Sequence, residues 1–191
     1  MSHARSSLVS RTLTALTVVA FTAAPSLVRA QATQAAHAGA AAKLDDPTIV
    51  AIFDAANQWD VQTGTLGEKK GSTKEVRDLG AMLARDHSAV LTQAKALANE
   101  LHVTPTPPRN FGMVKDHEAA VKTLEAAHGH AFDVAFLQHE IAFHQAVIDA
   151  ATNTLVPSLQ NQQVKDFVLK VAPNFAAHKL AAENLLAKIN K

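Results

Sequence analysis

The sequence predicts an all-α protein whose core is a bundle of four long helices. The chain of 191 residues has only 7 glycines and 7 prolines, too few for the many tight turns of an all-β domain. Its apolar residues recur every three to four positions instead of every second position, which is the helical period. Hydrophobic residues make up 48% of the chain and charged residues 18%, which excludes a disordered, charge-driven chain.

Residues 1–30 are predicted to be a cleavable signal peptide. Arg5 and Arg11 precede an apolar stretch, and small residues then offer cleavage near Ala30 or Ala32. The apolar stretch is shorter than the about 20 residues that a membrane-spanning helix needs, although an uncleaved anchor is the alternative. Removing residues 1–30 takes away three arginines and no acidic residue, so the formal net charge changes from +1 to −2. We therefore expect a periplasmic or secreted protein with no transmembrane span after signal removal.

A flexible leader is predicted at residues 31–45, followed by one helical domain at residues 46–191. The first helix is expected to begin with Asp46 as its N-cap and Pro47 at the first helical position. It should end at Gly71, since glycine is the commonest residue just past a helix C-terminus.

The second helix is expected to begin at Ser72, which forms a capping box with Glu75, and to reach about Leu101. The chain then meets three prolines that break the helical pattern, Pro105, Pro107 and Pro108. A shorter, polar helix is predicted at residues 111–128, with a stop near Gly129.

The third long helix is predicted from Phe132 to about Leu155, and the fourth from an N-cap at Asn161 to the C-terminus, with a kink at Pro173. Two short turns then make two antiparallel helical hairpins. One long connection, between the second and third long helices, carries the short extra helix. This is the connectivity of a ferritin-like four-helix bundle.

Each long helix has an apolar stripe that a single polar residue interrupts. The stripe of the last helix shows the spacing, with alternating steps of four and three: Val164, Val168, Val171, Phe175, His178, Ala182, Leu185 and Ile189. On the third helix the predicted stripe is Leu137, Ile141, His144, Ile148, Ala151 and Leu155. The residues that interrupt the four stripes are Asp60, His87, His144 and His178. Because a buried carboxylate or imidazole needs a partner, we expect these four side chains to meet.

Counting residues from each hairpin turn to the polar residue on either side of it shows which of the four side chains lie at the same height along the bundle. Asp60 and His87 differ by about four residues, or roughly 6 Å, and His144 and His178 by about six, or roughly 9 Å, which makes His178 the weakest member. Glu140 lies one turn before His144 and could be a further ligand. Asp86 could orient a histidine of a neighbouring helix as a second-shell carboxylate.

Three functions are compatible with this group. It could be a buried polar layer in a non-enzymatic envelope, stress or interaction protein, which is the first interpretation. It could also bind one divalent transition metal ion, such as zinc, copper, manganese or iron, for metal handling or stress protection. An enzyme that uses histidine acid–base chemistry is the third.

Other classes of protein and site are disfavoured by the composition. The chain has no cysteine, which excludes disulfides and thiolate metal sites. A ferritin-like di-iron centre needs a Glu-x-x-His pair on each of two bundle helices, and the only such pair here, Glu125 with His128, lies in the predicted short helix, which disfavours a di-iron centre. No patch combines basic and aromatic residues, so no nucleic-acid partner is expected. Trp59 is expected to be a packing residue, and five other histidines are expected in loops or on the surface: His102, His117, His128, His130 and His139.

Several segments together resemble the exported family called domain of unknown function 4142. They are residues 56–60 with Gly64 and Leu66, 76–82, Asp86-His87, 132–136 leading to His144, 153–157, and His178. The resemblance covers about residues 47–186 and implies a ferritin-like bundle outside the cytoplasm, with no established activity. Two positions depart from the family pattern. Asp60 replaces the usual Glu, and Phe143 replaces an Asp that often precedes the third-helix histidine, a role that Glu140 could take from one turn away.

Overall fold

The computed structural model describes residues 44–109 and 111–191, and all regular secondary structure in these ranges is helical. This confirms the all-α prediction. The predicted signal peptide at 1–30 and most of the predicted leader lie outside the described residues. The helices are α2 (Asp46–Lys70), α3 (Lys74–Glu100), α4 (Met113–Ala126), α5 (Gly129–Ala150), the π-helical turn η1 (Ala151–Leu155), α6 (Val156–Ser158) and α7 (Gln162–Ile189).

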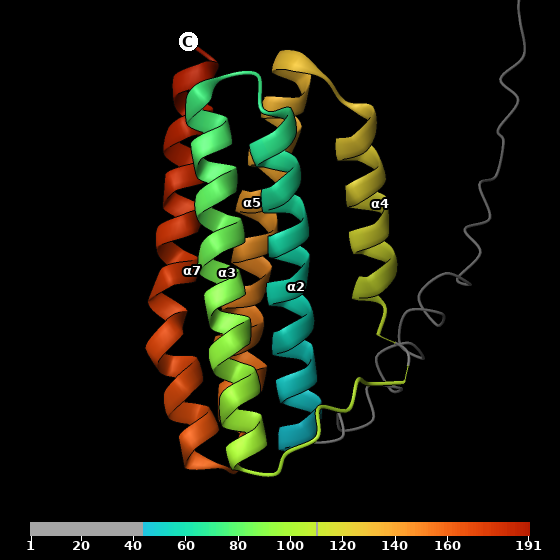
Figure 1. Ribbon diagram of the computed structural model, residues 1–191, viewed down its shortest axis with the longest axis vertical. Helices are drawn as coiled ribbons and strands as arrows, with labels where there is room; N and C mark the ends of the chain where they lie inside the picture. The colour runs from blue at the N-terminus through green and yellow to red at the C-terminus, as the bar shows by residue number, and fades with distance from the viewer. Residues whose placement is uncertain (1–43, 110) are drawn as a thin grey trace, which may run out of the picture. The chain divides into compact units, whose positions relative to one another are not determined.

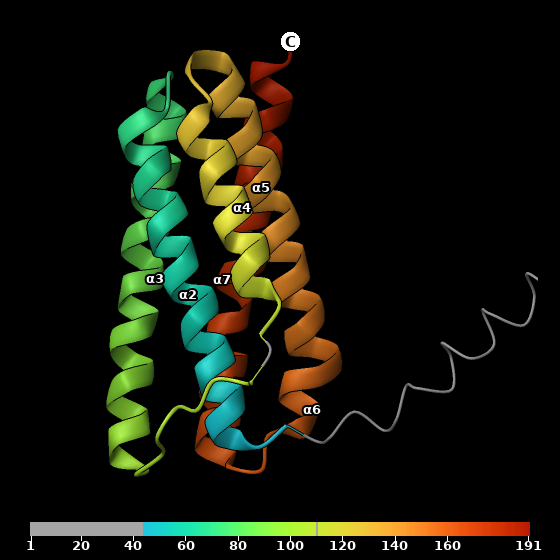
Figure 2. The ribbon, with the colours of Figure 1, turned by 90° about the vertical axis from the view of Figure 1, so that its right-hand side faces the viewer.

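The four long helices α2, α3, α5 and α7 lie side by side (Figure 1). The short turn after Lys70 makes α2 and α3 one hairpin, and α5 with its extension makes the second hairpin with α7. The long connection carries α4, which lies outside the four, against α2 and α5 (Figure 2). In the part of the chain that the structure describes, no helix combines the length and the apolar character required to cross a membrane.

Two of the predicted N-caps are wrong by one residue. Asp45, and not Asp46, caps α2 by accepting a hydrogen bond from the Thr48 amide at 2.9 Å. Asp46 instead accepts the backbone N–H groups of Gln160 and Asn161, at 2.8 and 2.7 Å, and so holds the turn before α7. These bonds cross from one hairpin to the other, which a local sequence pattern does not reveal.

The start of α3 is the second correction. Thr73 caps this helix through its bond with the Val76 amide, at 3.3 Å. Ser72, the predicted cap, donates both its backbone N–H and its hydroxyl to the carboxylate of Asp133 on α5. The capping signal was therefore placed in the right turn but on the wrong residue.

The second hairpin departs from the prediction at two places. The short helix ends at Ala126, and Gly129, the predicted stop, is instead the first residue of α5, with a φ of +56°. After Ala150 the helical path continues through η1 and α6 to Ser158, beyond the predicted end at Leu155. Helix α7 begins after its predicted cap, Asn161, and contains Pro173, the position of the predicted kink.

Helices α2 and α3 approach each other closely at two glycines. A Cβ atom on Gly64 would lie 2.8 Å from the carbonyl oxygen of Gly80, so no larger residue fits there without moving a helix. This contact fixes the spacing of the first hairpin next to the level of Asp60.

The core has two apolar clusters, one toward each end of the helices. The first gathers the N-terminal parts of α2 and α7 and the C-terminal parts of α3 and α5, including Phe53, Val90, Val147, Val168 and Phe175. The second gathers the opposite ends, including Leu79, Leu83, Phe132, Phe136 and Ala182. The polar residues that interrupt the stripes lie between the two clusters.

Candidate metal centre

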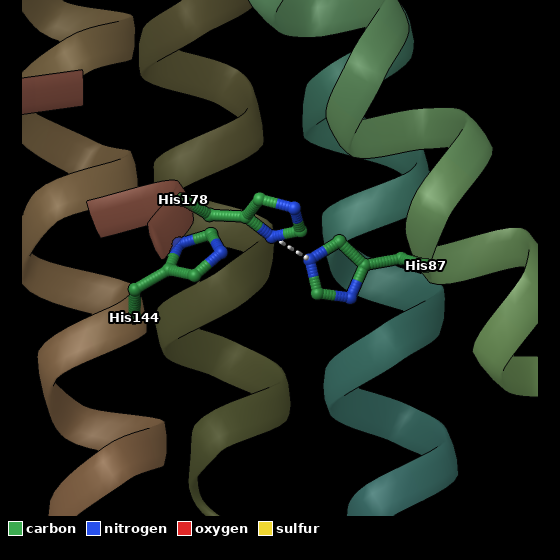
Figure 3. A group of neighbouring side chains, drawn as sticks. All are labelled: His87, His144 and His178. Carbon is green, nitrogen blue, oxygen red and sulfur yellow. Dashed lines mark hydrogen bonds between the residues drawn. The ribbon is translucent and has the colours of Figure 1, made fainter. Parts of the chain in front are cut away.

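All five predicted ligands are brought together at one level of the bundle. Asp60 comes from α2, His87 from α3, Glu140 and His144 from α5, and His178 from α7. His178 is 5% exposed and the other four are 1% exposed or less. The three imidazole rings point toward one another (Figure 3). Each hairpin therefore contributes ligands to a single buried centre.

The rings of His87 and His144 are each anchored through Nδ1. His87 Nδ1 lies 2.8 Å from Oδ1 of Asn57, and the Asn57 amide nitrogen donates to the Phe53 carbonyl at 2.8 Å, which orients its oxygen toward the ring. His144 Nδ1 lies 2.9 Å from the backbone carbonyl of Glu140. An oxygen acceptor places the ring proton on the nitrogen that faces it, so Nε2 of both rings carries a lone pair.

His178 is anchored in the opposite sense. Its Nε2 lies 3.2 Å from Oδ2 of Asp86, which leaves the lone pair on Nδ1. Asp86 therefore takes the orienting position that the sequence predicts for it. Histidines that bind metals characteristically donate their second nitrogen to a carboxylate or carbonyl oxygen in this way.

The nitrogens that carry lone pairs face one another. Nδ1 of His178 lies 3.2 Å from Nε2 of His87, and Nε2 of His144 is buried without a hydrogen-bond partner. One ring nitrogen from each of the three histidines lies within 4.8 Å of the others. Two nitrogens held about 2.1 Å from one tetrahedral zinc ion are about 3.4 Å apart, so the spacing fits a shared ion.

The two carboxylates complete the centre. Oδ2 of Asp60 lies 3.4 Å from Nε2 of His87, and Oε2 of Glu140 lies 3.5 Å from Nδ1 of His144. All four carboxylate oxygens are buried and none has a hydrogen-bond partner. Asp60, Glu140 and His144 also offer ligand atoms within 4.8 Å of one another, so His144 belongs to both groups. Both carboxylates lie nearest its Nδ1, and Oδ2 of Asp60 is the oxygen that lies beside a lone-pair nitrogen of the three-histidine group.

Burial controls the charge of these groups. It raises the pKa of Asp60 well above its usual value, with a further rise from the neighbouring Glu140, and it raises the pKa of Glu140 to about 7. Burial and the neighbouring histidines lower the pKa of His87 to about 2, and burial lowers the pKa of His144 to about 4. The pKa of His178 is also lowered by burial, against the opposing effect of Asp86. The imidazoles are thus neutral at pH 7, which is the form that binds metals.

The position of His178 corrects the height estimate. That estimate counted from Leu155, but the helical path of α5 continues through η1 and α6 to Ser158. His144 lies 14 residues before Ser158 and His178 lies 16 residues after Gln162, the two ends of the observed turn. The two histidines therefore differ in height by about two residues, or roughly 3 Å. His178 is therefore a full member of the cluster.

The stripe on α5 also differs from the prediction. Ile141 and Ile148 are half-buried, whereas Glu140 and Val147, one position earlier, are fully or almost fully buried. This rotation of the helix turns Glu140 from a flanking residue into a fully buried one.

One residue of the site was missed, and one histidine was misplaced. Asn57 is fully buried and orients His87, and its position one turn before Asp60 on α2 was the available signal. His117 is buried instead of exposed. Its ring stacks on Trp59 with centroids 5.0 Å apart, and its Nε2 lies 2.9 Å from Oε1 of Gln62. Trp59 thus packs α4 against α2.

The donor set suits one transition metal ion. Three neutral imidazoles and a carboxylate favour zinc, copper, iron or manganese over calcium and magnesium, which prefer oxygen ligands. Unpaired carboxylate oxygens and an unpaired imidazole nitrogen in a dry interior also carry a large desolvation cost that a cation would offset.

Comparison with known proteins identifies the family and no individual relative. No curated protein and no solved structure matches the chain. The family model described as Domain of unknown function (DUF4142) matches residues 30–185, and the chain therefore belongs to this family.

Proposed function

We propose that this protein binds one transition metal ion through His87, His144, His178 and Asp60, and serves metal handling or stress protection. The observation that carries the proposal is the arrangement of the imidazoles. Each ring has its outer nitrogen on an oxygen acceptor and its inner nitrogen turned toward the other two rings. Glu140, beside His144, would balance the charge of the bound ion together with Asp60.

The second candidate is a polar layer without metal, in a non-enzymatic envelope or interaction protein. The raised pKa of Glu140, about 7, favours it, because a protonated Glu140 could donate a hydrogen bond to Asp60. Even with that hydrogen bond, Nε2 of His144 has no partner, and the lone pairs of His87 and His178 face each other at 3.2 Å. The metal is therefore the better explanation.

We also propose that the chain is exported and that its bundle is ferritin-like. Residues 1–30 have the composition of a signal peptide, and the family match begins at residue 30. Two antiparallel hairpins joined by a long connection, with side chains from all four helices meeting in the bundle core, support the ferritin-like assignment.

Metal analysis of the untagged full-length chain tests the binding proposal. We expect one zinc, copper, iron or manganese ion per chain after purification or reconstitution, and less than a tenth of this amount in His87→Ala. His102→Ala is the matched control, because this histidine is exposed and outside the centre. If the wild-type chain takes up no stoichiometric metal, or if His102→Ala loses as much as His87→Ala, the proposal is wrong.

A further inference from the structure

A small, mostly apolar cavity, partly open to solvent beside the exposed Thr152 and Ala176, lies next to the candidate metal centre. Its volume is about 70 Å³, and it lies between α7 and the end of α5, where η1 begins. Its walls carry no charged side chain. Apolar cavities accept uncharged guests such as xenon.

The cavity exists because small residues and a π-helical turn coincide there. Ala151 and Thr152, the first two residues of η1, form one wall, and Ala172 and Ala176 of α7 form the opposite wall. A π turn widens the helix locally, and such turns are frequent at functional sites. Larger side chains at these alanines would fill the space.

A single aromatic ring separates the cavity from the histidines. Phe175 lines the cavity, and its ring centroid lies 5.1 Å from that of His87 and 5.8 Å from that of His144. Phe175 is 3% exposed and belongs to the apolar cluster below the centre. A guest that displaces this ring would reach His87 and His144.

We propose that this cavity admits a small uncharged molecule of two or three atoms, such as dioxygen or nitric oxide, to the metal ion. The inference rests on the proposed function. The small volume favours a small guest, and the absence of charged groups in the wall disfavours anions and cations. Such molecules bind iron and copper, which the donor set accepts.

Xenon tests the cavity without any metal. In crystals of the metal-free full-length protein under xenon pressure, we expect xenon between α5 and α7 beside Phe175. We expect no xenon in Ala172→Phe, whose ring would fill the cavity. If Ala172→Phe does not fold, Ala176→Leu on the same wall replaces it. Absence of xenon from the wild-type cavity would overturn the inference.

Nitric oxide tests the connection with the ion. In iron(II)-loaded protein, we expect Ala172→Phe to slow nitric oxide association at least tenfold at unchanged iron content, as followed by absorbance. Ala187→Phe, an exposed position on the same helix, should leave the rate unchanged. An equal rate in wild type and Ala172→Phe would overturn this inference alone, whereas failure to take up any of zinc, copper, iron and manganese would overturn the proposed function and the inference together.

Discussion

Two places in this bundle bury a carboxylate, and they treat it in opposite ways. Asp133 on α5 is fully buried, and it accepts hydrogen bonds from the backbone and the hydroxyl of Ser72. Asp60 and Glu140 are equally buried, yet none of their four oxygens accepts a hydrogen bond. The first carboxylate holds the turn between α2 and α3, and the second pair holds no structural element.

The difference shows that this fold provides hydrogen-bond donors to a buried carboxylate where that carboxylate holds a turn, as Asp133 does. Leaving a buried polar group unpaired costs about 1–3 kcal/mol, and more for a charged group. Oδ2 of Asp60 lies beside the lone pair of His87, where a cation would satisfy both, and Glu140 lies close enough to Asp60 to share its charge balance. The predictions below separate the structural acid from the ligand pair.

Metal removal should have the largest effect. If the free ion is present at 1,000 times its Kd, binding stabilises the folded state by about 4 kcal/mol, because the ion binds the native centre and not the unfolded chain. For a chain of this size, we expect a chelator to lower the Tm by about 10 °C in calorimetry. Asp133→Ala should show the same chelator shift as wild type. A metal-containing wild type whose Tm does not respond to chelator would break the comparison.

Replacing Glu140 with Gln should change the pH dependence of the metal-free protein. The folded-state pKa of Glu140 is about 7 against an ordinary 4.5, so the unfolded state releases this proton first as the pH rises. Wild-type stability therefore falls between about pH 4.5 and 7, and Glu140→Gln should be more stable at pH 8 by on the order of 3 kcal/mol.

Below pH 4.5 the Glu140 side chain is protonated in both states, and the difference between the two proteins should vanish. The histidines act with the opposite sign. The lowered pKa values of His87 and His144 mean that the unfolded state gains protons below about pH 6.5, which destabilises both proteins at low pH. Urea unfolding at several pH values measures the difference, and a difference that is constant with pH would contradict the assignment.

Asp133→Ala should destabilise the protein by about 2 kcal/mol whether or not metal is bound, since it removes two hydrogen bonds to a carboxylate. Urea unfolding with and without chelator measures this. A loss of metal content in Asp133→Ala would contradict this prediction, because Asp133 lies outside the centre and only positions the turn at Ser72.

Asn57→Ala should have the smallest of these effects on the metal centre, a loss of affinity for the ion. Without its oxygen, Nδ1 of His87 loses the acceptor that fixes the ring, and affinity for the ion should fall about tenfold. Competition with a chromogenic chelator measures the affinity. Gln58→Ala, at the exposed neighbouring position, should bind as tightly as wild type.

Helical spacing was sufficient to predict the residues that meet, because His87, His144 and His178 each replace an apolar residue in a regular stripe. It could not predict Asn57, whose role depends on a ring on another helix. The end of α5 was also unpredictable, because a π-helical turn follows from packing and not from local pattern. Likewise, Ser72 matches a cap locally, and only the arrival of Asp133 from the other hairpin shows its actual partner.

The division of the centre between two hairpins has a consequence for unfolding. Asp60 and His87 belong to the pair that Gly64 and Gly80 hold in close contact, and His144 and His178 belong to the other pair. Neither hairpin alone carries the full set of ligands, so an ion at this level would cross-link two segments that are distant in sequence. In a chain without cysteine, a bound ion held by four side chains would cross-link the two hairpins as a disulfide does in other proteins. The rate at which the bundle opens would then be limited by the rate at which the ion dissociates.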